Sequence, residues 1–231
     1  MFNKRSVTNR ASVSRVVGVI ASPAALARAA RLRHPPDLFE LRLDALYQSL
    51  GEVARVLPKL RAPLILTARH PAEGGCGNLN LAARRALLLR FLGSAAFVDL
   101  EFRSLRQMKA LIAQMRRRRI GLIISRHDLR DTPPPNELRR QAKLAAAARP
   151  AIFKVATRTD TPAQLARLIS FFETTRTPLP MAAMGIGKLG LASRRQLARL
   201  GSVLIYVSLG EANISGQPSL RQLRRDRRAY N

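Results

Sequence analysis

Residues 151–174, AIFKVATRTDTPAQLARLISFFET, contain the unit from which the whole fold is predicted. The segment IFKVA is apolar at every position but one, which is typical of a strand covered on both faces. Thr161 and Pro162 then provide an N-cap and a proline for the first turn of a helix. The stretch therefore predicts a buried strand followed directly by a helix.

The same alternation of a short apolar run with a longer, Arg- and Ala-rich segment recurs along the chain. It predicts strands over Arg15–Ala21, Leu38–Asp44, Pro63–Ala68, Ala95–Phe102, Arg119–Ser125, Ala151–Thr157, Pro178–Met184 and Ser202–Val207. It predicts helices over 23–33, 46–58, 79–91, 103–117, 135–148, 162–174, 192–200 and 218–229. Eight strands, each followed by a helix, indicate an α/β protein with a single (β/α)₈ TIM barrel. A doubly wound open sheet is the alternative, and the absence of G-x-G-x-x-G after the first strand and of a P-loop disfavours it.

The length suits this organisation. The chain has 231 residues, 47% of them hydrophobic, which is enough for one large domain with a core and short for two. We expect a basic tail over residues 1–14 and the catalytic barrel over 15–231. The N-terminus is free of acidic residues, as a targeting peptide would be, but the apolar run Val16–Ala21 is too short for a signal sequence, so a first strand is favoured.

Charge is the most unusual bulk property. Lys and Arg number 41 against 14 acidic residues, a net charge of +27. Most arginines recur at helical spacing, which indicates solvated helix faces. The charge predicts weak, salt-sensitive nucleic-acid binding. A dedicated nucleic-acid-binding protein is the second functional class, but zinc-ligand spacing and aromatic recognition motifs are missing and only 5% of residues are aromatic.

Other residue types narrow the possibilities further. Cys76 is the only cysteine, so an internal disulfide is impossible, as expected in a reducing, cytoplasmic compartment. No apolar run approaches the 18 residues of a transmembrane helix. His34, His70 and His127 lack the spacing of metal ligands, so we expect no metal site.

Charged side chains interrupt several of the predicted strands. Because strand residues alternate between two faces, Lys154 is predicted to point into the barrel, and so are the acidic and basic residues of two other strands. Those residues are Glu40, Arg42, Asp44, Asp99 and Glu101, with Arg69, His127 and Asp128 at strand ends. The C-terminal rim of this fold carries its chemistry, so the set predicts a catalytic site. An internal salt-bridge network is the alternative.

A lysine among apolar walls and arginines loses its proton more easily, because burial and like charge disfavour the ammonium. Lys154 is therefore a candidate for Schiff-base formation with a carbonyl. The resulting iminium acidifies the adjacent carbon, and His127 suits removal of that proton. Glu73 could orient the imidazole. Arginines could hold carboxylate or hydroxyl oxygens of a substrate, the candidates being Arg42, Arg69 and Arg194.

Six motifs in order then resemble one family, type I 3-dehydroquinate dehydratase. They are FELRLDAL, TARHPAEGG, SRHDLRDTP, FKVAT, MGIGKLGLASR and LGSVLIYVSLGEANISGQ, and they cover about residues 15–217. The resemblance implies a (β/α)₈ homodimer that needs no metal or dissociable cofactor. It also implies a lyase that converts 3-dehydroquinate to 3-dehydroshikimate in the shikimate pathway of aromatic amino acid biosynthesis. Another Schiff-base barrel enzyme, such as an aldolase, is disfavoured by Glu73-Gly74-Gly75 and His127-Asp128.

The resemblance also assigns roles to positions of this chain. Lys154 would form the imine, and His127, held by Glu73, would be the general acid and base. The substrate would be bound by Glu40, Arg42, Arg69, Arg194, Asn213 and Gln217. The chain departs from the family's Ser-Ala-Pro-Gly-Gln at Asn213–Gln217, where it reads NISGQ. We expect the surrounding segment, Gly210–Gln217, to act as a lid over the barrel mouth.

Overall fold

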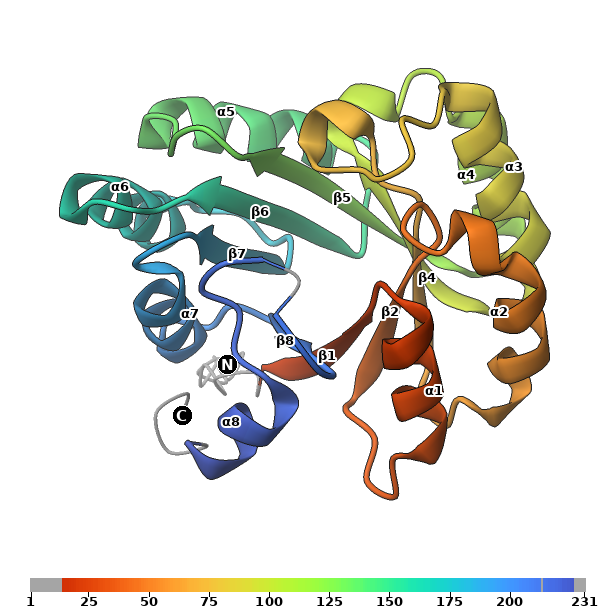
Figure 1. Ribbon diagram of the computed structural model, residues 1–231. Coiled ribbons are helices and arrows are strands. Elements are labelled where there is room, and N and C mark those ends of the chain that lie inside the picture. Colours follow the sequence, from red (N-terminus) through yellow and green to blue (C-terminus); the bar gives the residue numbers. More distant parts are fainter. Residues whose placement is uncertain (1–13, 213, 227–231) are drawn as a thin grey trace, which may run out of the picture.

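The computed structural model describes residues 14–212 and 214–226, and the predicted (β/α)₈ architecture is confirmed (Figure 1). Its parallel strands are β1 (Arg15–Ile20), β2 (Leu38–Arg42), β3 (Leu64–Thr67), β4 (Ala95–Glu101), β5 (Gly121–Asp128), β6 (Ile152–Arg158), β7 (Met181–Ile186) and β8 (Leu204–Ser208). They pair in the order β7-β6-β5-β4-β3-β2-β1-β8. The predicted tail over residues 1–14 lies, except for Ser14, outside the described residues.

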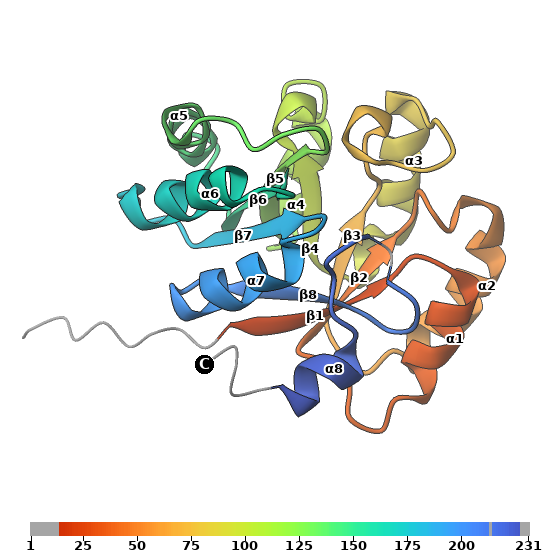
Figure 2. The ribbon, with the colours of Figure 1, turned by 60° about the vertical axis from the view of Figure 1, so that its left-hand side comes forward.

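Helices surround the strands on the outside of the barrel (Figure 2). They are α1 (Pro23–Arg31), α2 (Leu50–Val56), α3 (Leu81–Phe91), α4 (Lys109–Arg117), α5 (Pro135–Ala146), α6 (Pro162–Thr174), α7 (Gly190–Arg199) and α8 (Leu220–Arg225). Single 3₁₀ turns lie at Tyr47–Ser49, Leu57–Lys59, Pro71–Glu73, Leu92–Ser94 and Phe102–Ser104. No helix in the described part of the chain is both long enough and apolar enough to cross a membrane.

Element boundaries differ from the prediction where backbone chemistry intervenes. The second helix ends at Val56, because Pro58 lacks an N–H, and a 3₁₀ turn over Leu57–Lys59 follows it. The fifth strand starts at Gly121 rather than Arg119, because Arg119 has a left-handed φ of 56°. The same strand continues through Asp128, because its polar end pairs with β6. His127 therefore lies within a strand, where the backbone ladder fixes its position.

The inside of the barrel changes from apolar to charged along the strands. An apolar residue near the start of a strand is followed two positions later by a polar one, which alternation places on the same inner face. This occurs in five neighbouring strands, at Leu38 and Glu40, Ile65 and Thr67, Phe97 and Asp99, Ile123 and Ser125, and Ile152 and Lys154. The apolar layer fills one end of the barrel, so charged side chains gather toward the C-terminal end.

A second, larger core lies between the strands and the helices. It contains the alternate residues of the same strands, such as Phe39, Leu41 and Phe153, together with the buried faces of the helices. Lys154 is therefore buried by the barrel around it, while its strand neighbours are buried by the helix layer.

The barrel closes at a seam between β7 and β8, the two ends of the hydrogen-bonded order. The buried Ser202 hydroxyl accepts a hydrogen bond from the backbone N–H of Ala183 at 3.0 Å. Nearby, Val203 N–H donates to the carbonyl of Met181 at 2.9 Å. A side chain thus replaces part of the backbone pairing across the seam.

Ser202→Ala would leave the Ala183 N–H buried without its partner. We expect a loss of about 1–3 kcal/mol in the free energy of unfolding, the cost of an unsatisfied buried donor. Ser49→Ala is the matched control, because Ser49 makes no side-chain capping hydrogen bond. Urea denaturation followed by circular dichroism measures both. Equal stability losses in the two variants would contradict this account of the seam.

Candidate active site

A cavity of about 160 Å³ opens at the C-terminal end of the barrel. Eight of the nine predicted site residues line it, namely Glu40, Arg42, Arg69, Glu73, His127, Lys154, Arg194 and Gln217. The ninth, Asn213, lies outside the described residues. The other lining residues include Tyr206, Met184, Ile186 and Ile214, so charged groups face an otherwise apolar wall.

Lys154 is 2% exposed and lies near the middle of β6. Its Nζ lies 2.5 Å from Oδ2 of Asp99 and 3.7 Å from Oε1 of Glu40. It also lies 4.5 Å from the centroid of the Tyr206 ring, within cation–π distance. The expectation that apolar walls and arginines surround the amine is therefore wrong in one respect, since two carboxylates face it. The ammonium is paired, and its proton must leave before the nitrogen can attack a carbonyl.

Arg69 connects this pair to the rest of the barrel interior. Its Nη1 contacts Asp99 Oδ1 at 3.0 Å, Glu101 Oε1 at 3.2 Å and Ser125 Oγ at 2.7 Å. Burial alone would lower the pKa of Arg69, but the negative charges of Asp99 and Glu101 outweigh it and raise that pKa. For Asp99, burial opposes ionisation, yet the charges of Arg69 and Lys154 hold its pKa well below the usual range. Asp99 is therefore a fixed negative charge.

The network continues to the outer helices through Arg84 of α3. This arginine is 1% exposed and bonds Glu101 Oε2, the carbonyl of Ala68 at 2.8 Å and the hydroxyl of Ser104 at 3.3 Å. Sequence analysis missed Arg84 because it stands at helical spacing among many solvated arginines. The alternation of the strand correctly predicted that Asp99 and Glu101 lie on the inner face, but it assigned neither residue a role in the site.

His127 and Glu73 form a second pair at the other side of the cavity. One oxygen, Glu73 Oε2, accepts the backbone N–H of His127 at 2.9 Å and lies 3.1 Å from its ring Nδ1. A carboxylate at Nδ1 favours the tautomer protonated there, which leaves Nε2 as the basic nitrogen. Burial, together with the charges of Arg69 and Lys154, lowers the pKa of His127 well below its usual value. The imidazole is therefore neutral at physiological pH.

Two arginines of the cavity wall have different hydrogen-bond partners. Arg42 pairs with Asp44 through Nε at 3.0 Å and Nη2 at 2.7 Å, and it also donates to the carbonyl of Gly74 at 3.1 Å. Arg194 is 4% exposed on α7 and donates to the carbonyl of Tyr206 at 3.3 Å. Arg194 thus links α7 to β8 while lining the cavity.

The expected lid is attached to the turn after β7. The Gly187 N–H donates to the carbonyl of Ser215 at 3.0 Å. Gly216 has a left-handed φ of 81°, and a Cβ there would lie 2.6 Å from Gly190 Cα. Glycine is therefore required at this position by close packing, a reason that the sequence did not reveal. The contact holds Gln217, which is buried, at the cavity wall.

Comparison with known proteins agrees with this geometry. The family described as type I 3-dehydroquinase matches residues 19–229. The chain belongs to the type I 3-dehydroquinase family. A 3-dehydroquinate dehydratase of Pyrobaculum aerophilum is 34% identical over 189 residues, which cover 80% of this chain and 61% of that protein. One of Thermococcus gammatolerans is 30% identical over 90% of this chain and 95% of its own length.

Solved structures share the fold of this chain. The 3-dehydroquinate dehydratase of Geobacillus kaustophilus superposes with a TM-score of 0.82 at 22% identity, covering 92% of this chain and 89% of that one. The one from Aquifex aeolicus gives 0.78 at 25% identity, covering 94% and 98%. Within the described residues, no three His, Cys, Asp or Glu side chains gather in an arrangement that could hold a metal ion.

Glu73 provides a pH-dependent test of the site. Burial raises the pKa of this carboxyl from 4.5 to about 7. Ionising it in the folded protein therefore costs stability, a cost absent below pH 4.5 and complete above pH 7. Relative to wild type, Glu73→Gln should gain up to about 3 kcal/mol in free energy of unfolding between pH 4.5 and 8.

Urea denaturation at a series of pH values measures this difference. Glu173→Gln, which removes an exposed carboxylate, is the control. A stability difference between Glu73→Gln and wild type that stays constant across the range would show that Glu73 titrates as it does in the unfolded chain.

Proposed function

We propose that this protein catalyses the dehydration of 3-dehydroquinate to 3-dehydroshikimate through an imine on Lys154. The observation that carries the proposal is the placement of Lys154 and His127 on one small cavity in a chain of this family. The product would enter the shikimate pathway. Electrostatic complementarity supports the imine, because Asp99 and Glu40 place negative charge beside the nitrogen that becomes a positive iminium.

The first stage is covalent. The ammonium of Lys154 gives up its proton, and the neutral amine attacks the substrate's ketone carbon to form a carbinolamine. Loss of water from that adduct gives the iminium. Asp99 remains ionised throughout, so it favours both the initial ammonium and the iminium. The neutral His127, which lines the same cavity, is assigned to carry the protons exchanged in this stage.

The second stage is the elimination. Nε2 of His127 removes a proton from the carbon adjacent to the iminium, and the C–H electron pair forms an enamine. Expulsion of the β-hydroxyl, protonated by the imidazolium, releases water and gives the conjugated iminium. Hydrolysis then returns the amine of Lys154 and frees the product. Glu73 stabilises the transient imidazolium from the Nδ1 side.

Substrate binding is assigned to the remaining cavity residues. Arg194 is the carboxylate clamp, because it is a buried guanidinium at the cavity wall. Glu40, Arg42, Arg69 and Gln217 would contact the ring hydroxyls, with Asn213 contributing from the lid. Glu40 is held by the hydroxyl of Thr67 at 2.9 Å, and Arg69 by its carboxylates, so both are preorganised.

We also infer that residues 15–231 act as one catalytic domain, in a cytoplasmic homodimer. The family resemblance supports the dimer, and the single cysteine is compatible with a reducing compartment. Non-specific nucleic-acid binding is expected to be weak and to disappear as salt rises, because it rests on net charge alone.

The direct test combines an assay with covalent trapping. Purified protein should convert 3-dehydroquinate to a product with the absorbance of a conjugated enone, and borohydride should trap substrate on the peptide that contains Lys154. Lys154→Ala should abolish trapping and reduce turnover by several orders of magnitude. Lys188→Ala, which removes an exposed lysine near the rim, is the control and should retain both. An adduct on another lysine would refute the mechanism.

Replacement of His127 separates the two stages. His127→Ala should still be trapped by borohydride, while turnover falls by about 10²–10⁴-fold, the usual contribution of general acid–base catalysis. His70→Ala provides the comparison, because His70 is outside the cavity lining. Mass spectrometry of the trapped enzyme, together with the steady-state rate, gives both readouts. Wild-type turnover in His127→Ala would remove the histidine from the mechanism.

A further inference from the structure

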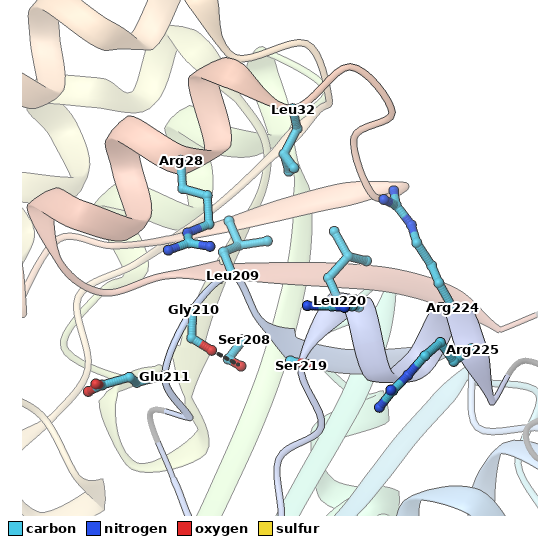
Figure 3. A pocket seen from close by; sticks show the side chains of 11 residues that line it. Arg28, Leu32, Ser208, Leu209, Gly210, Glu211, Ser219, Leu220, Arg224 and Arg225 are labelled. Atoms are coloured by element: carbon cyan, nitrogen blue, oxygen red, sulfur yellow. Dashed lines mark hydrogen bonds between the residues drawn. The ribbon is translucent and has the colours of Figure 1, made fainter.

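A second cavity lies outside the barrel mouth, between α1 and α8 (Figure 3). Its volume is about 680 Å³, within the range of small-molecule sites, and it shares no lining residue with the catalytic cavity. Three leucines form its apolar part: Leu32, which follows α1, Leu209, which follows β8, and Leu220 at the start of α8. Four arginines also line it, namely Arg28, Arg221, Arg224 and Arg225.

The charge of this groove is strongly unbalanced. Among the residues that the structure describes, Glu211 is the one acidic residue that lines it, against four arginines. None of the four arginines forms an ion pair with another described residue, although Arg224 donates a hydrogen bond to the carbonyl of His34. Leu209 and Leu220 lie between Arg28 and Arg224 in Figure 3. A guanidinium is thus available on either side of the apolar surface.

This combination selects a class of ligand. Guanidinium groups bind carboxylates and phosphates through paired N–H donors, while the leucines favour an apolar body. An inorganic anion would leave the leucines unused. A single-stranded nucleic acid would need aromatic side chains for stacking, and none of the described residues that line the groove is aromatic. The best fit is a small organic anion with an apolar body.

One wall of the groove is continuous with the catalytic cavity. Ser208, Leu209, Gly210 and Glu211 line the groove, and the same segment continues to Ile214 and Gln217 at the catalytic cavity. The Ser208 hydroxyl donates to the carbonyl of Gly210 at 3.1 Å (Figure 3), and the Ser208 N–H donates to the carbonyl of Pro218 at 2.9 Å. The two ends of the segment are therefore joined at Ser208, next to the groove.

We propose that the groove between α1 and α8 binds a small organic anion with an apolar body, and that binding further restrains the described residues 209–212 and 214–217 beside it. The effect on catalysis rests on the proposed function, whereas the binding itself does not. An occupied groove contacts the segment from its outer side, so it restricts the backbone that carries Gln217. The ligand would then act as an effector of the active site.

Methyl NMR of leucine-labelled protein tests binding, with 2-naphthyl phosphate as the probe. We expect saturable shifts at Leu32, Leu209 and Leu220, and binding at least tenfold tighter than that of inorganic phosphate. The methyl groups of Leu129, which lines the catalytic cavity, report any binding there separately. Arg28→Ala combined with Arg224→Ala should weaken groove binding at least tenfold. Arg31→Ala, an exposed arginine on the same helix outside the groove, should not.

Three outcomes would overturn the proposal of an organic-anion site. They are unshifted groove leucines, equal affinity for inorganic phosphate, and tighter binding of a short single-stranded RNA at the same leucines.

Hydrogen exchange of peptides from 209–217, with and without the probe, tests the coupling between the groove and this segment. Protection is expected on binding, and unchanged exchange in the saturated protein would overturn it. Lys154→Ala should bind the probe as wild type does. Binding at the groove can therefore be measured even if the proposed chemistry on Lys154 is wrong.

Discussion

The ion pair between Lys154 and Asp99 is the interaction on which the interior of this barrel depends. Removing two charges from water has a desolvation cost. Their mutual attraction offsets that cost only when the geometry is excellent and further hydrogen-bonding partners are present. Arg69 provides those partners by joining Asp99 to Glu101, and Arg84 extends the chain to the helix layer. Three cations and three anions alternate in this network once Glu40 is included. Lys154 can therefore be buried without a net buried charge.

That balance also favours the proposed chemistry. When Lys154 loses its proton, the network is left with one excess negative charge, and formation of an iminium restores neutrality. The network is thus complementary to the two cationic states of the nitrogen. Proton transfer is assigned to a separate pair, His127 and Glu73, whose pKa values are moved in opposite directions by burial. A neutral base and a fixed negative charge therefore coexist within one cavity.

The sequence predicted the barrel and most of the site because both depend on alternation. A polar residue two positions after an apolar one on the same strand face is visible without coordinates, and it correctly placed Glu40, Asp99 and Lys154 inside. Contacts between residues far apart in the sequence could not be predicted in this way. Arg84 resembles the solvated arginines of its helix, and the pairing of Lys154 with Asp99 depends on the spatial relation of two strands far apart in sequence. The requirement for Gly216 depends on its close approach to Gly190, which no local pattern encodes.

The least regular part of the barrel lies beside both cavities. Between β7 and β8, the side chain of Ser202 provides a connection that a backbone ladder makes elsewhere, and Arg194 of α7 bonds the backbone of β8. The segment after β8 then lines both the catalytic cavity and the arginine-rich groove. A substrate carboxylate held by Arg194 would act directly on β8, because the same guanidinium donates to the carbonyl of Tyr206.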